Sequence, residues 1–177
     1  MKKFLYVVVF FVLLTGFLPA QAKKIKPDDV TQPQKTQLEK RQIQTREYDS
    51  TDKAMVMKAM LNVLQDEGFI VSNANPLLGF ISGEKDFDIN DRSIDIENEF
   101  GVKKNAINWA GVCIAVVDST ANVTEYGKQI RVRVNFKRKL LNVYGNAQSI
   151  VEIDDENYYQ RFFAEVDKAI FLQKQKI

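Results

Sequence analysis

Oxygen-bearing side chains recur at set intervals in an acidic segment near the middle of the chain. Asp86, Asp88, Asn90 and Glu97 occupy positions one, three, five and twelve of a loop with EF-hand spacing. That spacing allows one chain to wrap around a single calcium ion. Position six is Asp91 instead of the glycine that the sharp turn needs, and the residues before the loop have the pattern of a strand. The segment is a candidate calcium site, with a solvated acidic loop as the alternative.

A second set of charged side chains lies in a stretch of strict alternation between residues 128 and 140. Because side chains alternate across a strand, one side carries the basic residues Arg131, Arg133, Lys137 and Lys139, and the other side carries Val132, Val134 and Phe136. This pattern is typical of a strand with one solvated face. The alternative is a docking surface for an acidic partner, a lipid headgroup or the chain's own acidic segment.

Residue types that support catalysis are scarce. The chain has no histidine, which is the commonest general base and metal ligand. It also lacks a nucleophile-elbow pattern and a phosphate-binding loop. Two carboxylates of the acidic segment could perform glycosidase chemistry, but nothing in the sequence places them across a cleft. We therefore expect no catalytic residues, no enzymatic activity and no cofactor.

The single cysteine, Cys113, lies in an apolar stretch and excludes an intramolecular disulfide. We interpret it as a small hydrophobic residue, because no histidine is present to activate its thiol.

The first 22 residues have the three parts of a secretory signal peptide. Lys2 and Lys3 precede an apolar run over residues 4–18, and Ala20 and Ala22 form a small-x-small cleavage site. Fifteen helical residues extend only about 22 Å, whereas a membrane core is about 30 Å thick. We expect cleavage near Ala22 and release into the periplasm or the medium. No cysteine follows the cleavage site, so we expect no lipid anchor and no stable membrane attachment.

The charge balance argues against polyanionic partners. Two of the 25 basic side chains belong to the signal segment, so that 23 basic and 23 acidic side chains would remain after cleavage. A formally neutral chain lacks the general electrostatic attraction that nucleic acids and anionic bilayers require. We therefore expect no nucleic acid partner.

Residues 23–40 are rich in lysine and glutamine, contain Pro27 and Pro33, and are predicted to form a flexible linker. A single domain is predicted over residues 41–177, with an acidic insertion at about 86–104. Strands are predicted over residues 41–48, 69–73, 80–84, 109–118, 128–140 and 147–153. A helix is predicted to begin after Asp49, Ser50 or Thr51 and to end at Gly68. Residues 122–127 are predicted to be a connection.

A second helix is predicted to begin after Asp154 or Asp155. Its helical spacing aligns Tyr159, Phe162, Phe163, Val166, Ile170 and Phe171. The fold class that follows is α+β: an antiparallel sheet of five to six strands with two amphipathic helices packed on one face. The aromatic face serves this packing, or alternatively it lines a groove for an apolar ligand between helix and sheet.

Three segments carry a resemblance to known proteins. AMVMKAMLNVLQDEGF, LLGFISGEK and NYYQRFFAEVDKAIFLQKQKI resemble the opening and the closing helix of small Gram-negative envelope proteins, many of them lipoproteins of unknown role. The helix and hairpin are more distantly similar to the helix-grip domains of the outer-membrane-assembly lipoprotein BamC. This resemblance implies a non-enzymatic accessory or binding module of the cell envelope. It transfers no catalytic residue, and the missing lipidated cysteine departs from the lipoprotein pattern.

We therefore expect a non-enzymatic module of the periplasm or cell envelope that binds another envelope protein through the open sheet face and its edges. The alternative is a carrier of a small apolar ligand or lipid in the groove beside the C-terminal helix.

Overall fold

Two amphipathic helices carry the long apolar stripes of the domain. The computed structural model describes residues 35–89, 91 and 93–175, and these helices are α2 (Lys53–Asp66) and α4 (Glu156–Gln175). In α2 the buried residues recur at helical spacing: Val56, Met57, Ala59, Met60, Val63 and Leu64. In α4 the buried residues are Tyr159, Phe162, Phe163, Val166 and Ile170.

One residue of the predicted α4 stripe does not belong to it. Phe171 is 60% exposed. Consecutive residues of an α-helix are about 100° apart around the axis, so Phe171 projects to the side of a stripe that ends with Ile170. The prediction that Phe171 belongs to the buried face is therefore wrong.

Local hydrogen bonds set the ends of α2. Asp52 is the N-cap, one residue after the predicted candidates, and its carboxylate accepts from the backbone N–H of Met55 at 2.9 Å. At the other end Gly68 has φ +86°, a left-handed conformation that glycine adopts without strain. The N–H groups of Gly68 and Phe69 donate to the carbonyls of Gln65 and Leu64, at 2.9 and 2.8 Å. The predicted helix end at Gly68 is confirmed.

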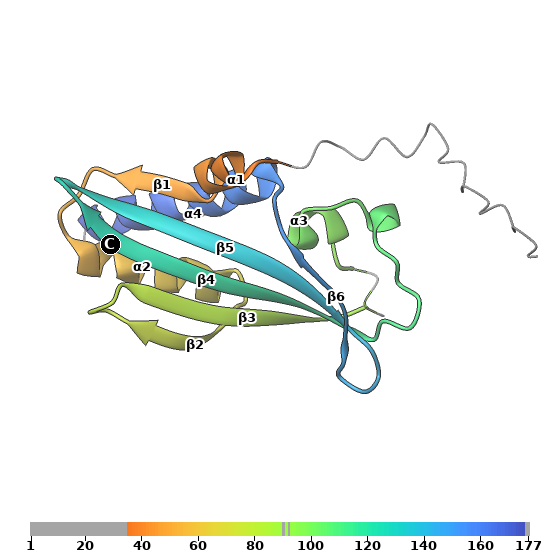
Figure 1. Cartoon of the computed structure of the whole chain (residues 1–177). Helices are drawn as coiled ribbons and strands as arrows, with labels where there is room; N and C mark the ends of the chain where they lie inside the picture. Colours follow the sequence, from red (N-terminus) through yellow and green to blue (C-terminus); the bar gives the residue numbers. More distant parts are fainter. Residues whose placement is uncertain (1–34, 90, 92, 176–177) are drawn as a thin grey trace, which may run out of the picture. The chain divides into compact units, whose positions relative to one another are not determined.

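Six strands form one antiparallel sheet (Figure 1). They are β1 (Thr45–Tyr48), β2 (Ile70–Asn75), β3 (Phe80–Asp88), β4 (Ile114–Tyr126), β5 (Gln129–Leu141) and β6 (Ala147–Glu152). The order is β1-β5-β4-β3-β2, and β6 also pairs with β5. Two strands therefore pair with the same edge of β5: β1 pairs with its first half and β6 with its second half.

Backbone groups of β5 in the gap between β1 and β6 find other partners. Val134 N–H donates to the carbonyl of Gln44 at 2.9 Å, and Phe136 N–H donates to the hydroxyl of Tyr159 at 3.3 Å. The same hydroxyl donates to the carbonyl of Ile153 at 3.0 Å. A side chain of α4 thus completes the hydrogen bonding of the central strand, as a buried backbone requires.

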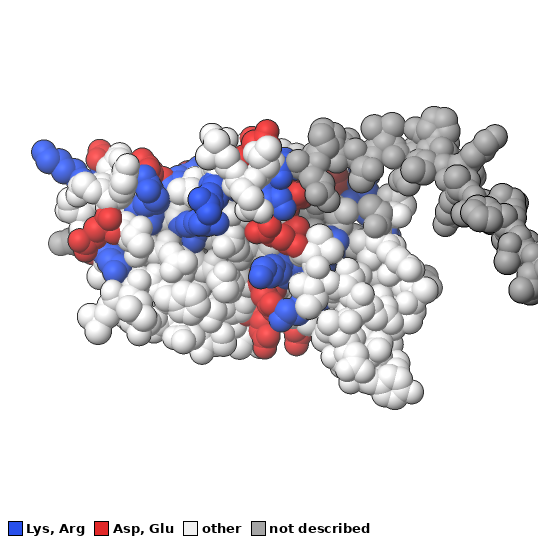
Figure 2. Space-filling view, in the orientation of Figure 1, with Lys and Arg blue, Asp and Glu red and all other residues white. Residues whose placement is uncertain are grey.

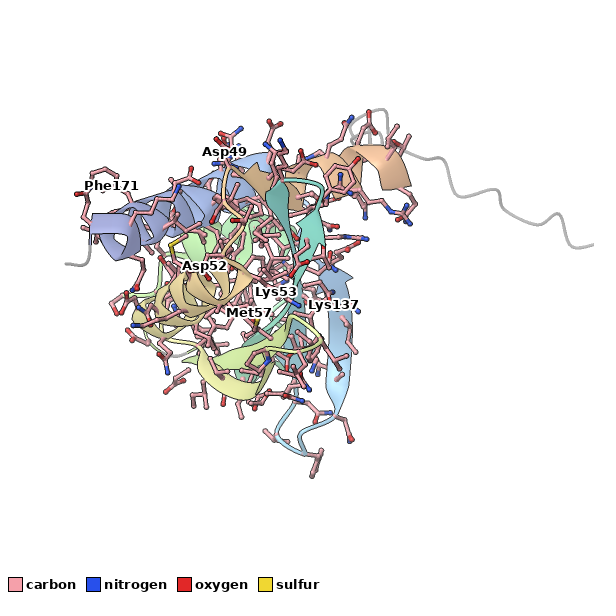
Figure 3. The ribbon with its side chains drawn as sticks, turned by 90° about the vertical axis from the view of Figure 1, so that its left-hand side faces the viewer. Asp49, Asp52, Lys53, Met57, Lys137 and Phe171 are labelled. Atoms are coloured by element: carbon pink, nitrogen blue, oxygen red, sulfur yellow. The ribbon has the colours of Figure 1, made fainter. Side chains whose placement is uncertain are left out.

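Both helices cover the same face of the sheet and contact each other (Figures 1 and 3). Figure 3 shows Met57 of α2 and Phe171 of α4 on one side of the sheet and Lys137 of β5 on the other. Phe136 is fully buried between the layers. The centre of its ring lies 5.0 Å from that of Phe162 and 5.6 Å from that of Tyr159. The predicted α+β fold, with two helices packed on one face of an antiparallel sheet, is confirmed.

The start of the domain differs from the prediction. A short helix, α1 (Gln37–Ile43), occupies the end of the predicted linker and the start of the predicted first strand. Thr36 caps this helix by accepting from Glu39 N–H, while the Glu39 carboxylate accepts from Thr36 N–H. The described residues from 35 to 175 form one compact unit. The predicted signal segment, residues 1–22, and residues 23–34 of the predicted linker lie outside the described residues.

Two further elements differ in length from their predictions. β4 continues to Tyr126, so the predicted connection at residues 122–127 is wrong except for the turn at its end. Ala121 and Val123 are fully buried under the helices, and this alternating burial keeps the strand extended. Within the acidic insertion, β3 continues to Asp88, and α3 (Ile96–Phe100) and the 3-10 helix η1 (Lys104–Ala106) follow.

Candidate functional site

The face of the sheet opposite the helices is the surface on which the predicted basic residues meet (Figure 2). We call it the open face. Its charged residues gather in a stripe across the strands, which we define as Glu84, Asp86, Asp118, Lys137, Lys139 and Glu152. Residues paired across strands point to the same side, and Glu152, Lys137, Asp118 and Glu84 are consecutive partners in the register. The stripe contains four acids and two lysines.

Acidic residues of neighbouring strands lie beside the predicted basic residues of β5. Arg131 forms two hydrogen bonds with a carboxylate oxygen of Glu47, at 2.7 and 2.9 Å, and its guanidinium stacks 3.4 Å from the ring centre of Tyr126. Lys139 forms an ion pair with Asp118. Lys137 is exposed between Glu152 and Asp118. Acids thus lie beside Arg131, Lys137 and Lys139, and binding by these residues stays a prediction.

Arg133 lies opposite Thr45, the first residue of β1. One guanidinium nitrogen lies 3.5 Å from the side-chain oxygen of Gln44, whose amide nitrogen donates to Glu152 at 3.0 Å. Gln44 is 1% exposed. The Nε atom of Arg133 is buried without a hydrogen-bond partner among the described residues. The structure thus places all four predicted basic residues on one face and gives each a different environment.

The residues of the candidate calcium site are spread over two elements. Asp86 and Asp88 belong to β3, which is paired with β4 along its whole length, and Glu97 belongs to α3. Asn90 lies outside the described residues. In the described part of the chain, no three carboxylate or cysteine side chains are grouped so that they could hold a metal ion. Calcium binding stays a prediction.

The acidic insertion contributes to the core. Phe100 is 1% exposed and contacts the ring of Phe87, with the ring centres 4.8 Å apart. Three basic side chains of the domain contact the insertion. Lys85 pairs with Glu99 at 2.8 Å, and Arg138 and Arg161 donate to the carbonyls of Phe100 and Asn98, at 3.2 and 2.9 Å. These three cations are not among the four basic residues of β5 that the sequence offered as a docking surface for the acidic segment.

A cluster of exposed apolar residues lies around the hairpin that joins β5 and β6. We call it the hairpin patch and define it as Ile114, Val143, Tyr144, Ile150 and Val151, whose exposed fractions are 42%, 71%, 84%, 59% and 44%. Ile114 pairs with Leu141, and Ile150 pairs with Lys139 on the same end of β5. This patch was not predicted from the sequence. Its signal was two large apolar residues inside the turn of residues 142–146, where polar residues usually occur.

The space between α4 and the sheet is filled. Phe136 contacts four rings, those of Phe69, Tyr158, Tyr159 and Phe162, with ring centres 5.0 to 5.8 Å apart. Two cavities of the described structure lie at the margins of α4. One of about 420 Å³ lies beside α1 and is lined by Gln42, Arg46 and Phe163, and one of about 300 Å³ lies beside α3 and is lined by Glu67, Glu99 and Tyr158. Both have charged walls.

These features define a class of protein: an α+β domain whose helices cover one sheet face and leave the other open. No family model matches the chain, and no curated protein matches its sequence. Among solved structures, the chain is similar to a DUF4468 family protein from Bacteroides ovatus. The identity is 12%, the TM-score is 0.35, and the match covers 71% of this chain and 84% of that chain.

None of the helices among the described residues has the length and apolar character that crossing a bilayer would require. Cys113, which the sequence suggested to be buried, is partly exposed and unpaired. Its backbone N–H donates to the carbonyl of Leu141 at 2.8 Å.

Proposed function

We propose that this protein is a non-enzymatic module of the cell envelope that binds another protein through the hairpin patch. The observation that carries the proposal is the exposure of Tyr144 and Val143, at 84% and 71%, beside Ile150 at 59%. Large exposed apolar patches on soluble domains commonly mark sites of protein contact. Tyrosine is also enriched among the residues that dominate the binding energy of protein interfaces.

The edge of β6 adds a second element to this surface. β6 pairs with β5 on one side, and no described strand pairs with its other side. Ile150 and Val151 point to opposite faces of this edge strand, and both are exposed. An extended segment of a partner can add to such an edge through backbone hydrogen bonds and bury both side chains. The patch thus offers apolar anchors and backbone pairing together.

The proposed location follows from the predicted signal segment, which supports export of the mature domain. The resemblance to the helix-grip domains of BamC supports a role beside other envelope proteins, and we propose a related accessory role here. The carrier alternative has weaker support, because the rings around Phe136 occupy the space between α4 and the sheet.

The proposal predicts site-specific crosslinking. A photoreactive amino acid at position 144 is expected to give one discrete crosslinked product in intact cells, and the protein is expected in the periplasmic fraction of the same cells. Tyr144→Asp should lower partner capture at least tenfold, because a carboxylate would have to be desolvated in the interface. The measurement is the yield of crosslinked partner, identified by mass spectrometry.

Leu77 supplies a matched control. It is 90% exposed in the turn between β2 and β3, at the opposite end of the sheet from the hairpin patch (Figure 1). Leu77→Asp should leave capture unchanged, and a photoreactive residue at position 77 should not yield the product. Equal crosslinking from both positions would contradict the proposal, as would an apolar molecule that native mass spectrometry finds in the purified protein.

A further inference from the structure

The part of the open face beyond the charged stripe carries uncharged polar side chains. Asn73, Ser82, Thr120 and Asn135 are consecutive partners across β2, β3, β4 and β5. Phe80 and Asn122 are partners in the row two residues further along the strands. We call these six residues the amide face. None of the six carries a formal charge, and Arg133 is the next partner of Asn122 in its row.

Asparagine is an unusual choice at these positions. It is depleted in β-strands, because its short polar side chain competes with the backbone for hydrogen bonds. Three asparagines nevertheless meet on one face, on three different strands of this sheet: Asn73, Asn122 and Asn135. Residues that oppose local preference mark positions used for something other than strand stability.

Three side chains of the amide face present unengaged polar groups to the solvent. Among the described residues, the side chains of Asn73, Thr120 and Asn122 are exposed and form no hydrogen bond. The side-chain oxygen of Asn135 is buried and also has no partner there. Only the hydroxyl of Ser82 is engaged, with that of Ser72 at 3.0 Å. Amides and hydroxyls both donate and accept, so the surface presents both functions in close alternation.

An aromatic ring lies within this polar surface. Phe80 is partly exposed and does not belong to the hydrophobic core or to the residues packed against it. Its partners in the register are Asn75 and Asn122, which are both polar. A phenyl ring in this position offers an apolar platform, and a ligand that covers it recovers the free energy of apolar burial.

We infer that the amide face binds an uncharged oligosaccharide. A sugar ring has an apolar face of C–H groups that can stack on Phe80, and hydroxyls around its rim that both donate and accept. The lack of charge on the amide face argues against polyanions, which need basic contacts to bind. Strands are about 4.8 Å apart, so the four strands span roughly 14 Å, enough for two or three sugar units. Strand faces of other β-folds bind oligosaccharides in a comparable way.

The test begins with the mature protein on an array of immobilised neutral and anionic oligosaccharides, and the strongest neutral ligand is then titrated by calorimetry. Phe80→Ala should weaken binding by tenfold or more through loss of the stacking platform. Thr120→Val and Asn122→Ala should each weaken it about fivefold, the effect of one hydrogen bond of about 1 kcal/mol. Tyr144→Asp and Leu77→Asp should leave it unchanged.

Failure of this inference is separable from failure of the proposed protein interface. Phe80→Ala should leave crosslinking at position 144 intact, because Phe80 does not belong to the hairpin patch. The inference is overturned if no neutral oligosaccharide binds, if anionic ones bind better, or if the three amide-face variants bind like the unaltered protein. All three positions lie outside the core, so thermal unfolding of each variant should match that of the unaltered protein.

Discussion

Replacing Phe136 with alanine is expected to lower the free energy of unfolding by about 3–5 kcal/mol. Phe136 is fully buried and contacts the rings of Phe69, Tyr158, Tyr159 and Phe162. The truncation removes apolar contacts and leaves a cavity in the layer that joins α4 to the central strand. A small domain has about 5–15 kcal/mol of total stability, so this single change removes a large part of it. Denaturant unfolding followed by circular dichroism measures the loss.

Phe171→Ala is the matched control for this variant. It also removes a phenyl ring, in this case from α4. Because Phe171 is 60% exposed, the free energy of unfolding should fall by no more than about 0.5 kcal/mol. If Phe136→Ala does not fold, Phe136→Leu keeps most of the volume and should lose less, about 1–2 kcal/mol. Equal losses at positions 136 and 171 would mean that α4 does not pack on the sheet as described.

Alkaline pH is expected to unfold this domain more steeply than the ion pairs alone would cause. Burial raises the pKa of Tyr159 to about 12 from an ordinary value of 10.0, and burial also raises the pKa values of Tyr48 and Tyr158. A raised pKa in the folded state means that folding favours the protonated form. The resulting stability is fully present below about pH 10 and is lost as the pH rises through about 12.

Each of these three tyrosines should contribute about 1.4 kcal/mol per pH unit in this window, or roughly 4 kcal/mol per unit together. Denaturant unfolding at several pH values between about 9 and 11.5 measures the slope. Tyr159→Phe should reduce the slope by about 1.4 kcal/mol per unit. A slope that is the same with and without the Tyr159 hydroxyl would refute the assignment.

The same substitution has a cost below pH 10. It removes the hydroxyl that accepts from Phe136 N–H and donates to the Ile153 carbonyl, and unpaired buried backbone groups cost about 1–3 kcal/mol. Tyr158 provides the comparison, because its hydroxyl forms no hydrogen bond among the described residues. Tyr158→Phe should therefore change the stability at neutral pH much less than Tyr159→Phe.

The main elements of the fold could be predicted from the sequence because their patterns were regular. The helical spacing of Val56, Met60 and Val63 and the alternation along β5 both result from burial of one face. Such a pattern can be recognised within a single helix or strand. The short helix α1 was missed because none of its residues is buried. Its sequence signal was the pair Thr36 and Glu39, a capping box at the required spacing.

The surfaces could not be predicted because they depend on pairing between strands. The basic residues of β5 were visible, but their acidic partners Glu47, Asp118 and Glu152 lie on other strands whose register the sequence does not state. Phe100 was hidden for a similar reason, because an isolated aromatic residue in an acidic segment has no periodicity. The amide face is likewise formed by residues from four strands, each unremarkable in its own segment.

The helices α2 and α4 cover one face of the sheet and leave the other to the solvent, and both proposed surfaces depend on this arrangement. Proton NMR of the mature domain with a water-soluble paramagnetic agent tests this arrangement most directly. We expect the ring signals of Tyr126 and Tyr144, which are 52% and 84% exposed, to broaden strongly. The ring signals of Phe136, Tyr159 and Phe163, each at most 1% exposed, should stay sharp. Broadening of this second group would show that the helices do not cover the sheet and would contradict the account.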